Sequence, residues 1–300
     1  APTPTLPQRG REKGGGGRPS VKGEAAAKVN LSLQVRPPDR RGRHPLLSVV
    51  QSVSWYDSLE MEASQEDTLD ARGAPVPLGE ANLVWKAINA LRRSGERLPV
   101  QVRLDKRIPM VAGLGGGSAD AAAALTLYAR LTDFPAEGLA AVAGQIGADV
   151  PVCLEGGFVL MEGFGERLSP LGPAGDDYWL AIAVPPFELP TADVYARWDR
   201  LDGPSGTPVV VRHLPPSLRY HGPLRNDLYP AAASLVPELD DWRRELEASW
   251  DRPVLSSGSG PALFGFFLGE EEAVAALAEV PGSVRAKRAV APVPQGVTVS

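Results

Sequence analysis

Residues 109–120 read Pro-Met-Val-Ala-Gly-Leu-Gly-Gly-Gly-Ser-Ala-Asp, and an alanine-rich segment with helical spacing follows as far as Arg130. Ser118 is suited to cap that helix, while Asp120 and Arg130 match the positive and negative ends of its dipole. A glycine loop that enters a helix presents free backbone N–H groups and lets a ligand approach the main chain closely. The segment therefore predicts a site for an anion, most commonly a nucleotide phosphate, although the glycines alone also fit a plain turn.

Two common phosphate motifs do not match this loop. A P-loop requires a lysine directly after its last glycine, and no lysine follows here. A dinucleotide fingerprint requires a third glycine where Ser118 stands, and an acidic residue at the end of a second strand about twenty positions later. The sequence therefore disfavours a dinucleotide-dependent oxidoreductase.

The composition excludes several other classes of protein. The 300 residues are 43% hydrophobic and carry a net charge of −5, so a sizeable core is expected and no basic field for a nucleic acid is available. No apolar run reaches the roughly 18 residues that span a membrane. The single cysteine, Cys153, excludes an intramolecular disulfide and favours a reducing compartment, so we expect a cytoplasmic protein. The oligomeric state is not readable from the sequence, and a homodimer is compatible with it.

The chain divides by composition into an arm and two folded parts. Residues 1–20 are rich in Pro, Gly and charged residues and predict a disordered N-terminal arm. Residues 169–177 contain two prolines, two glycines and two aspartates, and resemble a linker. We therefore expect a first domain over 21–170 and a second over 171–300.

Strand and helix patterns mix without the regular alternation of a doubly wound sheet, which favours an α+β fold. Strands are expected at 28–35, 46–59, 100–104, 178–184 and 263–268, with an extended segment at 147–154. Helices are expected at 82–93, 118–130, 137–146, 191–201 and 271–279, and 235–250 is amphipathic.

Four segments stand in a characteristic order: Ala-Ala-Lys-Val-Asn-Leu at 26–31, the loop at 109–122, Gly-Ala-Asp-Val-Pro at 147–151, and Ser-Gly-Ser-Gly-Pro-Ala at 257–262. Together they resemble the motifs of the GHMP kinases. Within that group, the resemblance is closest to the kinases that phosphorylate a cytidyl diphosphate sugar alcohol for isoprenoid synthesis. It implies a two-domain fold, with an N-terminal domain like ribosomal protein S5 domain 2 and a ferredoxin-like C-terminal domain.

The resemblance implies a catalytic pair and a loop that binds ATP. Asp149 would be the catalytic base, fixed at the start of a strand, and Lys28 would lie beside it and lower the pKa of the acceptor hydroxyl. Alternation along a strand places Asn30 on the same face as Lys28. The residues expected to bind ATP are Pro109, Met110, Val111, Ala112, Gly113, Leu114, Gly115, Gly116, Gly117, Ser118 and Ala119.

The acceptor site is expected near Asn30, His44, Thr191 and Tyr195. His44 matches a family histidine that contacts cytosine, whereas Arg43 replaces the family tyrosine and could stack on the base through its guanidinium. Tyr195 follows Pro190-Thr191, where the family has an aromatic residue. Mg²⁺ is expected to arrive on the nucleotide, so we assign no protein metal ligand. The alternatives are another GHMP kinase, of the homoserine or mevalonate type, and a nucleotide-binding regulatory protein without catalysis.

Overall fold

The computed structural model describes residues 19–93, 95, 97–173, 175 and 177–300. Its larger sheet forms around two long antiparallel strands, β1 (Ser20–Val35) and β2 (Leu46–Ala63). The first half of β2 pairs with β5 (Phe158–Gly163), and its second half pairs with β4 (Val100–Lys106). The other strands of this sheet are β3 (Thr68–Gly73), parallel to β4, β6 (Arg167–Gly172), paired with β5, and β11 (Val297–Val299), paired with β1.

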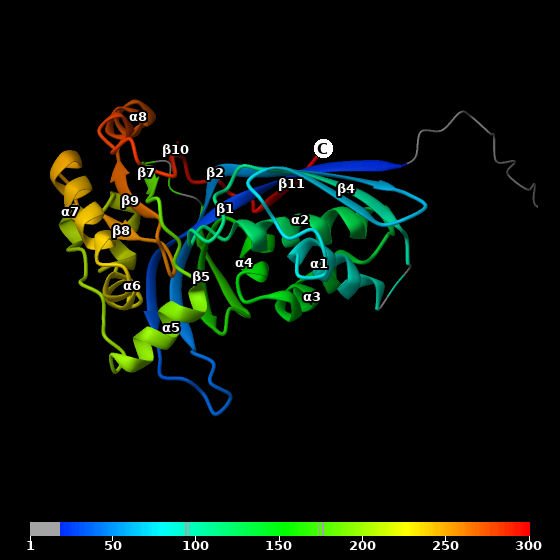
Figure 1. Cartoon of the computed structure of the whole chain (residues 1–300), viewed down its shortest axis with the longest axis horizontal. Coiled ribbons are helices and arrows are strands. Elements are labelled where there is room, and N and C mark those ends of the chain that lie inside the picture. The colour runs from blue at the N-terminus through cyan, green and yellow to red at the C-terminus, as the bar shows by residue number, and fades with distance from the viewer. Residues whose placement is uncertain (1–18, 94, 96, 174, 176) are drawn as a thin grey trace, which may run out of the picture.

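Four helices cover one face of the larger sheet (Figure 1). They are α1 (Leu83–Arg92), α2 (Gly116–Leu131), α3 (Leu139–Ile146), which follows the short η1 (Ala136–Gly138), and α4 (Val150–Glu155). The alanines of α2 are buried, because small side chains let the helix lie close to β1 and β2. This packing holds the N-terminus of α2, and with it the glycine loop, in a fixed place.

The second sheet has the strand order β10-β7-β9-β8. Its strands are β7 (Trp179–Val184), β8 (Leu255–Ser256), β9 (Leu263–Phe267) and β10 (Ala286–Val290). The helical segments around it are α5 (Thr191–Arg200), η2 (Val211–His213), η3 (Pro216–His221), α6 (Tyr229–Leu235), α7 (Glu238–Trp250) and α8 (Glu270–Ala278). Because helices connect β7 to β8 and β9 to β10, this is a ferredoxin-like arrangement.

One apolar cluster joins the two sheets. Val29 and Leu31 of β1 pack in the same buried group as Ile182 of β7 and Phe264 of β9. The cluster fixes the second sheet against β1, so that segments from both halves meet above the middle of β1.

The predicted α+β fold is confirmed, and the elements differ from the prediction in several places. Residues 150–155 form helix α4 instead of an extended segment, because Pro151 fits the first turn of a helix, where its missing N–H costs nothing. Strands β3, β5 and β6, helix α6 and the first residues of β1 were not predicted. Helix α2 begins at Gly116 with Gly115 as its N-cap, so Ser118 lies inside the first turn and is not the cap.

The expected arm at 1–20 lies outside the described residues except for its last two, and Ser20 already begins β1. The division into 21–170 and 171–300 stays our proposal. The two sheets follow it, except that β6 ends at Gly172 and β11 returns to the larger sheet. In the described part of the chain, no helix is long and apolar enough to cross a membrane.

Candidate active site

The glycine loop lies between the end of β4 and the start of α2. Gly113 and Gly115 have φ angles of +81° and +69°, which other residues rarely adopt. A Cβ on Gly113 would overlap the carbonyl oxygen of Ser257, so glycine is also required by space. No side chain caps α2, which leaves its first backbone N–H groups open to a ligand.

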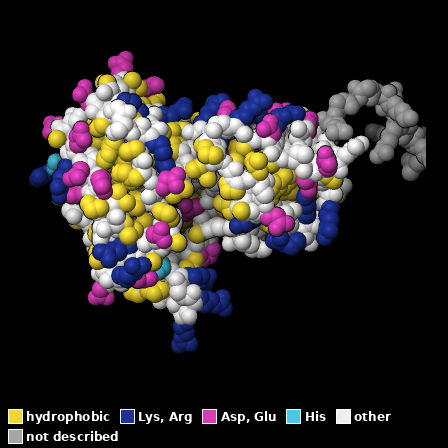
Figure 2. All heavy atoms as spheres, viewed as in Figure 1, with side chains coloured by type: hydrophobic (Ala, Val, Ile, Leu, Met, Phe, Trp, Pro, Cys, Tyr) yellow, Lys and Arg dark blue, Asp and Glu magenta, His cyan; other side chains and the backbone are white. Residues whose placement is uncertain are grey.

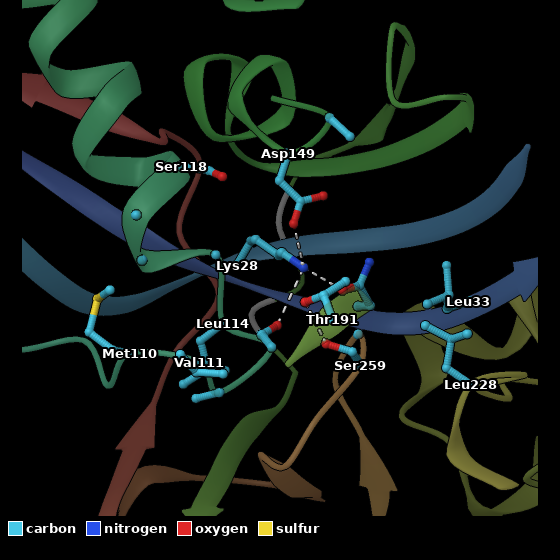
Figure 3. Close-up of a pocket in the computed structure, with 18 of the residues that line it drawn as sticks. Lys28, Leu33, Met110, Val111, Leu114, Ser118, Asp149, Thr191, Leu228 and Ser259 are labelled. Carbon is cyan, nitrogen blue, oxygen red and sulfur yellow. Dashed lines mark hydrogen bonds and ion pairs between the residues drawn. The ribbon is translucent and has the colours of Figure 1, made fainter. Parts of the chain in front are cut away.

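A cavity of about 380 Å³ opens along this loop. Among the expected residues, its lining includes Lys28, Asn30, Asp149, Thr191, Tyr195 and the whole of 109–118. Ala119 does not line it, because it faces the sheet from α2 and is fully buried. In Figure 3, Ser118 and Met110 lie on one side of Lys28, and Leu33 and Leu228 lie on the other. The cavity therefore has a glycine-loop end and an apolar end, with Lys28 between them.

Lys28 is the centre of the polar contacts in this cavity. Its Nζ lies 3.1 Å from Asp149 Oδ2, and it donates to Asn30 Oδ1 at 2.5 Å and to the carbonyl of Gly113 at 3.3 Å (Figure 3). The Lys28 side chain is only 4% exposed, whereas that of Asp149 is 34% exposed and faces the cavity. This gives a buried cation that holds an accessible carboxylate, the arrangement expected of a base and its partner.

Asp149 reaches this place from a helix end and not from a strand. It is the N-cap residue of α4, and its side chain makes no capping hydrogen bond. The carboxylate is therefore free to turn toward Lys28, and the expectation of a strand start at this position was wrong.

A second glycine turn, at 257–261, closes the floor of the cavity. Ser257 Oγ donates to the carbonyl of Gly113 at 2.8 Å and accepts from the Asn30 backbone at 3.0 Å. Thr191 Oγ1 lies 3.0 Å from Ser259 Oγ. Asn226 donates to the carbonyl of Gly258 at 2.7 Å and so braces this turn.

His44 and Tyr195 meet at the apolar end. Their rings are 5.1 Å apart and tilted by 36°, and Trp198 contacts His44 edge-on at 5.4 Å. His44 Nδ1 lies 3.1 Å from the Arg36 carbonyl, and Nε2 lies 3.4 Å from Asp199. Tyr195 lines the cavity and His44 stands behind it. Burial, and the charge of Asp149, raise the pKa of Tyr195 to about 12, so its hydroxyl stays neutral.

Arg43 is already engaged within the protein. It bonds Asp39 at 3.0 Å and its guanidinium stacks on Phe164 at 3.9 Å. The loop between β1 and β2 that carries it projects from the molecule, and basic side chains gather on it (Figures 1 and 2). Phe164 thus covers one face of the Arg43 guanidinium, and stacking of this side chain on a cytosine stays a prediction.

Sequence reasoning missed a buried ionic cluster next to the loop. Lys106 at the end of β4 pairs with Asp57 of β2 and with Asp120 of α2, and all three side chains are almost fully buried. A lysine at the end of a strand usually reaches solvent. The signal that could have suggested a partner for Lys106 is that it ends a buried strand.

Known proteins resemble this chain in sequence and in structure. The profile of the GHMP kinases N terminal domain matches residues 82–157. A 4-diphosphocytidyl-2-C-methyl-D-erythritol kinase of Cereibacter sphaeroides is 39% identical over 86% of this chain and 95% of the relative. One of Thermoanaerobacter pseudethanolicus is 36% identical over 82% of this chain and 87% of the relative.

Solved structures of GHMP kinases also resemble this chain. A 4-(cytidine 5'-diphospho)-2C-methyl-D-erythritol kinase superposes with a TM-score of 0.74 at 34% identity, covering 91% of this chain and all of the other. A homoserine kinase from Cytophaga hutchinsonii shares the fold, with a TM-score of 0.69 at 21% identity over 99% of this chain and 100% of that one. The chain belongs to the 4-diphosphocytidyl-2-C-methyl-D-erythritol kinase family of the GHMP kinases.

Proposed function

We propose that this chain transfers the γ-phosphoryl group of ATP to the 2-hydroxyl of 4-diphosphocytidyl-2-C-methyl-D-erythritol, in the cytoplasm, within the non-mevalonate route to isoprenoid precursors. Relatives of that name match most of the chain. The observation that carries the proposal is the contact of 3.1 Å between Lys28 and Asp149. This pair lies between the uncapped N-terminus of α2, which suits phosphates, and the apolar end of the cavity, where aromatic rings suit a nucleotide base.

ATP would bind with its phosphates on the loop at 109–118. Phosphoryl transfer depends on positioning and on stabilising charge on the transferred group, and the open N–H groups of α2 supply both. The described residues contain no group of three or more His, Cys, Asp or Glu side chains that could hold a metal ion. We assign no protein ligand to Mg²⁺, which would bind mainly through the phosphates of the nucleotide and neutralise part of their charge.

The reaction follows from the contacts of Asp149. The acceptor oxygen attacks the γ-phosphorus, the bond from that phosphorus to the oxygen of ADP breaks, and the hydroxyl proton passes to the Asp149 carboxylate. Lys28 stabilises the oxygen as it loses its proton. Asn30 orients Lys28 through its Oδ1, and its own amide is fixed by a donation to Ser48 Oγ at 2.8 Å.

The cytidyl group would lie at the apolar end. Tyr195 supplies a neutral aromatic face, His44 supports that ring from behind, and Thr191 with Ser259 supplies hydroxyls between this end and Lys28. Base stacking on an aromatic ring is worth about 1–3 kcal/mol. The diphosphate would then lie between the stacked base and the reacting hydroxyl.

The test is ADP release from MgATP with three acceptors in parallel: the cytidyl alcohol, homoserine and mevalonate. We expect release only with the cytidyl alcohol. ADP release with homoserine or mevalonate alone would show that the chain is a GHMP kinase for that acceptor instead. ATP binding without release on any acceptor would favour a regulatory protein.

A further inference from the structure

The buried cluster of Lys106, Asp57 and Asp120 has no role in the chemistry above. Lys106 Nζ contacts Asp57 Oδ2 and lies 2.8 Å from Asp120 Oδ2. The exposed fractions of the three side chains are 0%, 0% and 4%. One ammonium group therefore faces two carboxylates in a space from which water is excluded, which is costly to build.

The cluster lies directly beneath the phosphate-binding turn. A Cβ on Gly116, the first residue of α2, would stand 2.8 Å from Lys106 Nζ, so the ammonium group touches the backbone of that turn. Asp57 Oδ1 also accepts from the backbone N–H groups of Arg107 and Ile108, at 2.6 and 2.8 Å. The three side chains thus tie the strand that enters the glycine loop to the helix that leaves it.

The two carboxylates are not equivalent. Asp57 accepts from three donors, whereas Asp120 Oδ1 has no hydrogen-bond partner among the described residues. Asp120 is therefore the group that takes up a proton at least cost. Burial raises the pKa of Asp120 to about 7, with Lys106 opposing the shift and Asp57 adding to it.

Other groups around α2 leave this balance intact. Cys153 of α4 faces the cluster, and burial raises the pKa of its thiol so that it stays neutral. Lys28 of β1 and Asp149 at the start of α4 pair with each other. Helix α3 contains no charged residue. The cations of α1 and its C-cap are either exposed or paired with Asp67, namely Lys86, Arg92 and the C-cap residue Arg93.

We propose that Lys106 and Asp120 are positioning residues that set the place and the net charge of the phosphate-binding turn, and so control the affinity for ATP without touching it. The inference rests on the proposed function only in that ATP is the ligand of this turn. Lys106 and Asp57 neutralise each other, so the cluster carries a net charge of −1 when Asp120 is ionised and of zero when Asp120 is protonated, and only the ionised form opposes phosphates at the helix N-terminus. By reciprocal linkage, bound phosphates and a proton on Asp120 favour each other.

The first test is Asp120→Asn, which keeps an acceptor for Lys106 and removes the charge. We measure Kd for MgATP by calorimetry between pH 6 and pH 8.5, without acceptor and with saturating Mg²⁺. The wild-type Kd should rise about threefold as the pH passes 7, and the variant should stay flat, binding about threefold more tightly at pH 8. Protonation of MgATP itself affects both proteins equally, so a difference between their profiles of Kd against pH is caused by residue 120.

A merely structural role would not improve binding or remove a pH dependence. Parallel profiles for wild type and Asp120→Asn, or weaker binding by the variant at pH 8, would overturn the proposal. A wild-type chain that binds no MgATP would instead refute the proposed function and this inference with it.

The second test is Lys106→Met, matched with Lys86→Met on the exposed face of α1. We expect Lys106→Met to raise Kd for MgATP at least tenfold and to leave the KM of the acceptor within twofold, while Lys86→Met matches wild type. Equal Kd values for the two variants would overturn the proposal. Where Lys106→Met fails to fold, the pH profile of Asp120→Asn decides alone.

Discussion

Gly115→Ala tests whether the glycine loop positions Lys28. Gly115 has a φ of +69°, where an alanine costs about 1–2 kcal/mol. The added Cβ would stand 2.8 Å from Lys28 Cγ and 3.0 Å from Cε. Since carbon atoms pack favourably at about 3.5–4.0 Å, the Lys28 side chain must retreat by roughly 0.7 Å.

That retreat removes Lys28 from its contacts. In the wild-type chain, Lys28 Nζ lies 3.1 Å from Asp149 and 2.5 Å from Asn30. The loss of either contact would misplace the proposed catalytic base. A misplacement of about 1 Å can cost about 10²-fold, so we expect kcat to fall about 30- to 100-fold, or about 2–3 kcal/mol in barrier. The assay is ADP release at saturating substrates, with thermal unfolding of the same samples.

The matched control is Gly144→Ala, on the exposed face of α3, where an added Cβ meets nothing within 4 Å. Alanine in a helix should stabilise it by about 0.5–1 kcal/mol and leave kcat unchanged. If Gly115→Ala folds and keeps kcat within threefold of wild type, the loop does not position Lys28 and the reasoning fails.

Three further predictions follow from single contacts. Asp149→Asn should lower kcat at least about 10³-fold with Kd for MgATP unchanged; single-turnover assays that show less than a tenfold loss would mean that positioning alone drives transfer. His44→Ala should raise the acceptor KM about tenfold and leave the KM of ATP alone, because His44 supports Tyr195; an unchanged acceptor KM contradicts this role. A hydrogen bond from Arg92 lowers the pKa of Asp67 in the folded chain. The pair therefore stabilises the folded state above about pH 4, and this stabilisation is lost as the pH falls through the pKa that Asp67 has in the folded chain. Asp67→Asn should therefore cost about 0.5–1 kcal/mol at pH 7, since the pair is partly exposed, and nothing near pH 2, by urea unfolding.

Local rules predicted the parts of the site that one element holds. Strand alternation places Lys28 and Asn30 on one face, and their side chains are in contact. The run of glycines before alanines marks the start of α2 within two residues. These features depend on backbone conformation and near neighbours, which the sequence encodes directly.

Long-range contacts were beyond those rules. The Lys106 cluster joins β2, β4 and α2, and the pairing of its three side chains has no signature in any one segment. The engagement of Arg43 with Phe164 depends on β5 lying beside β2. The extended segment expected at 147–154 contains Pro151, a residue that the first turn of a helix also accepts, so the local pattern does not separate the two structures.

The glycine loop keeps its shape through bonds to the second half of the chain. Arg285 donates to the carbonyl of Met110 at 2.9 Å, the Ala262 N–H donates to Ala112 at 3.0 Å, and Ser257 donates to Gly113 at 2.8 Å. Between these anchors Val111 holds a φ of +49°, which a β-branched residue keeps only when its surroundings impose it. Residues 82–157 therefore contain the phosphate motif but not the contacts that fix its conformation. The conformation of the proposed phosphate site therefore depends on the packing of both sheets, and the glycine motif alone does not determine it.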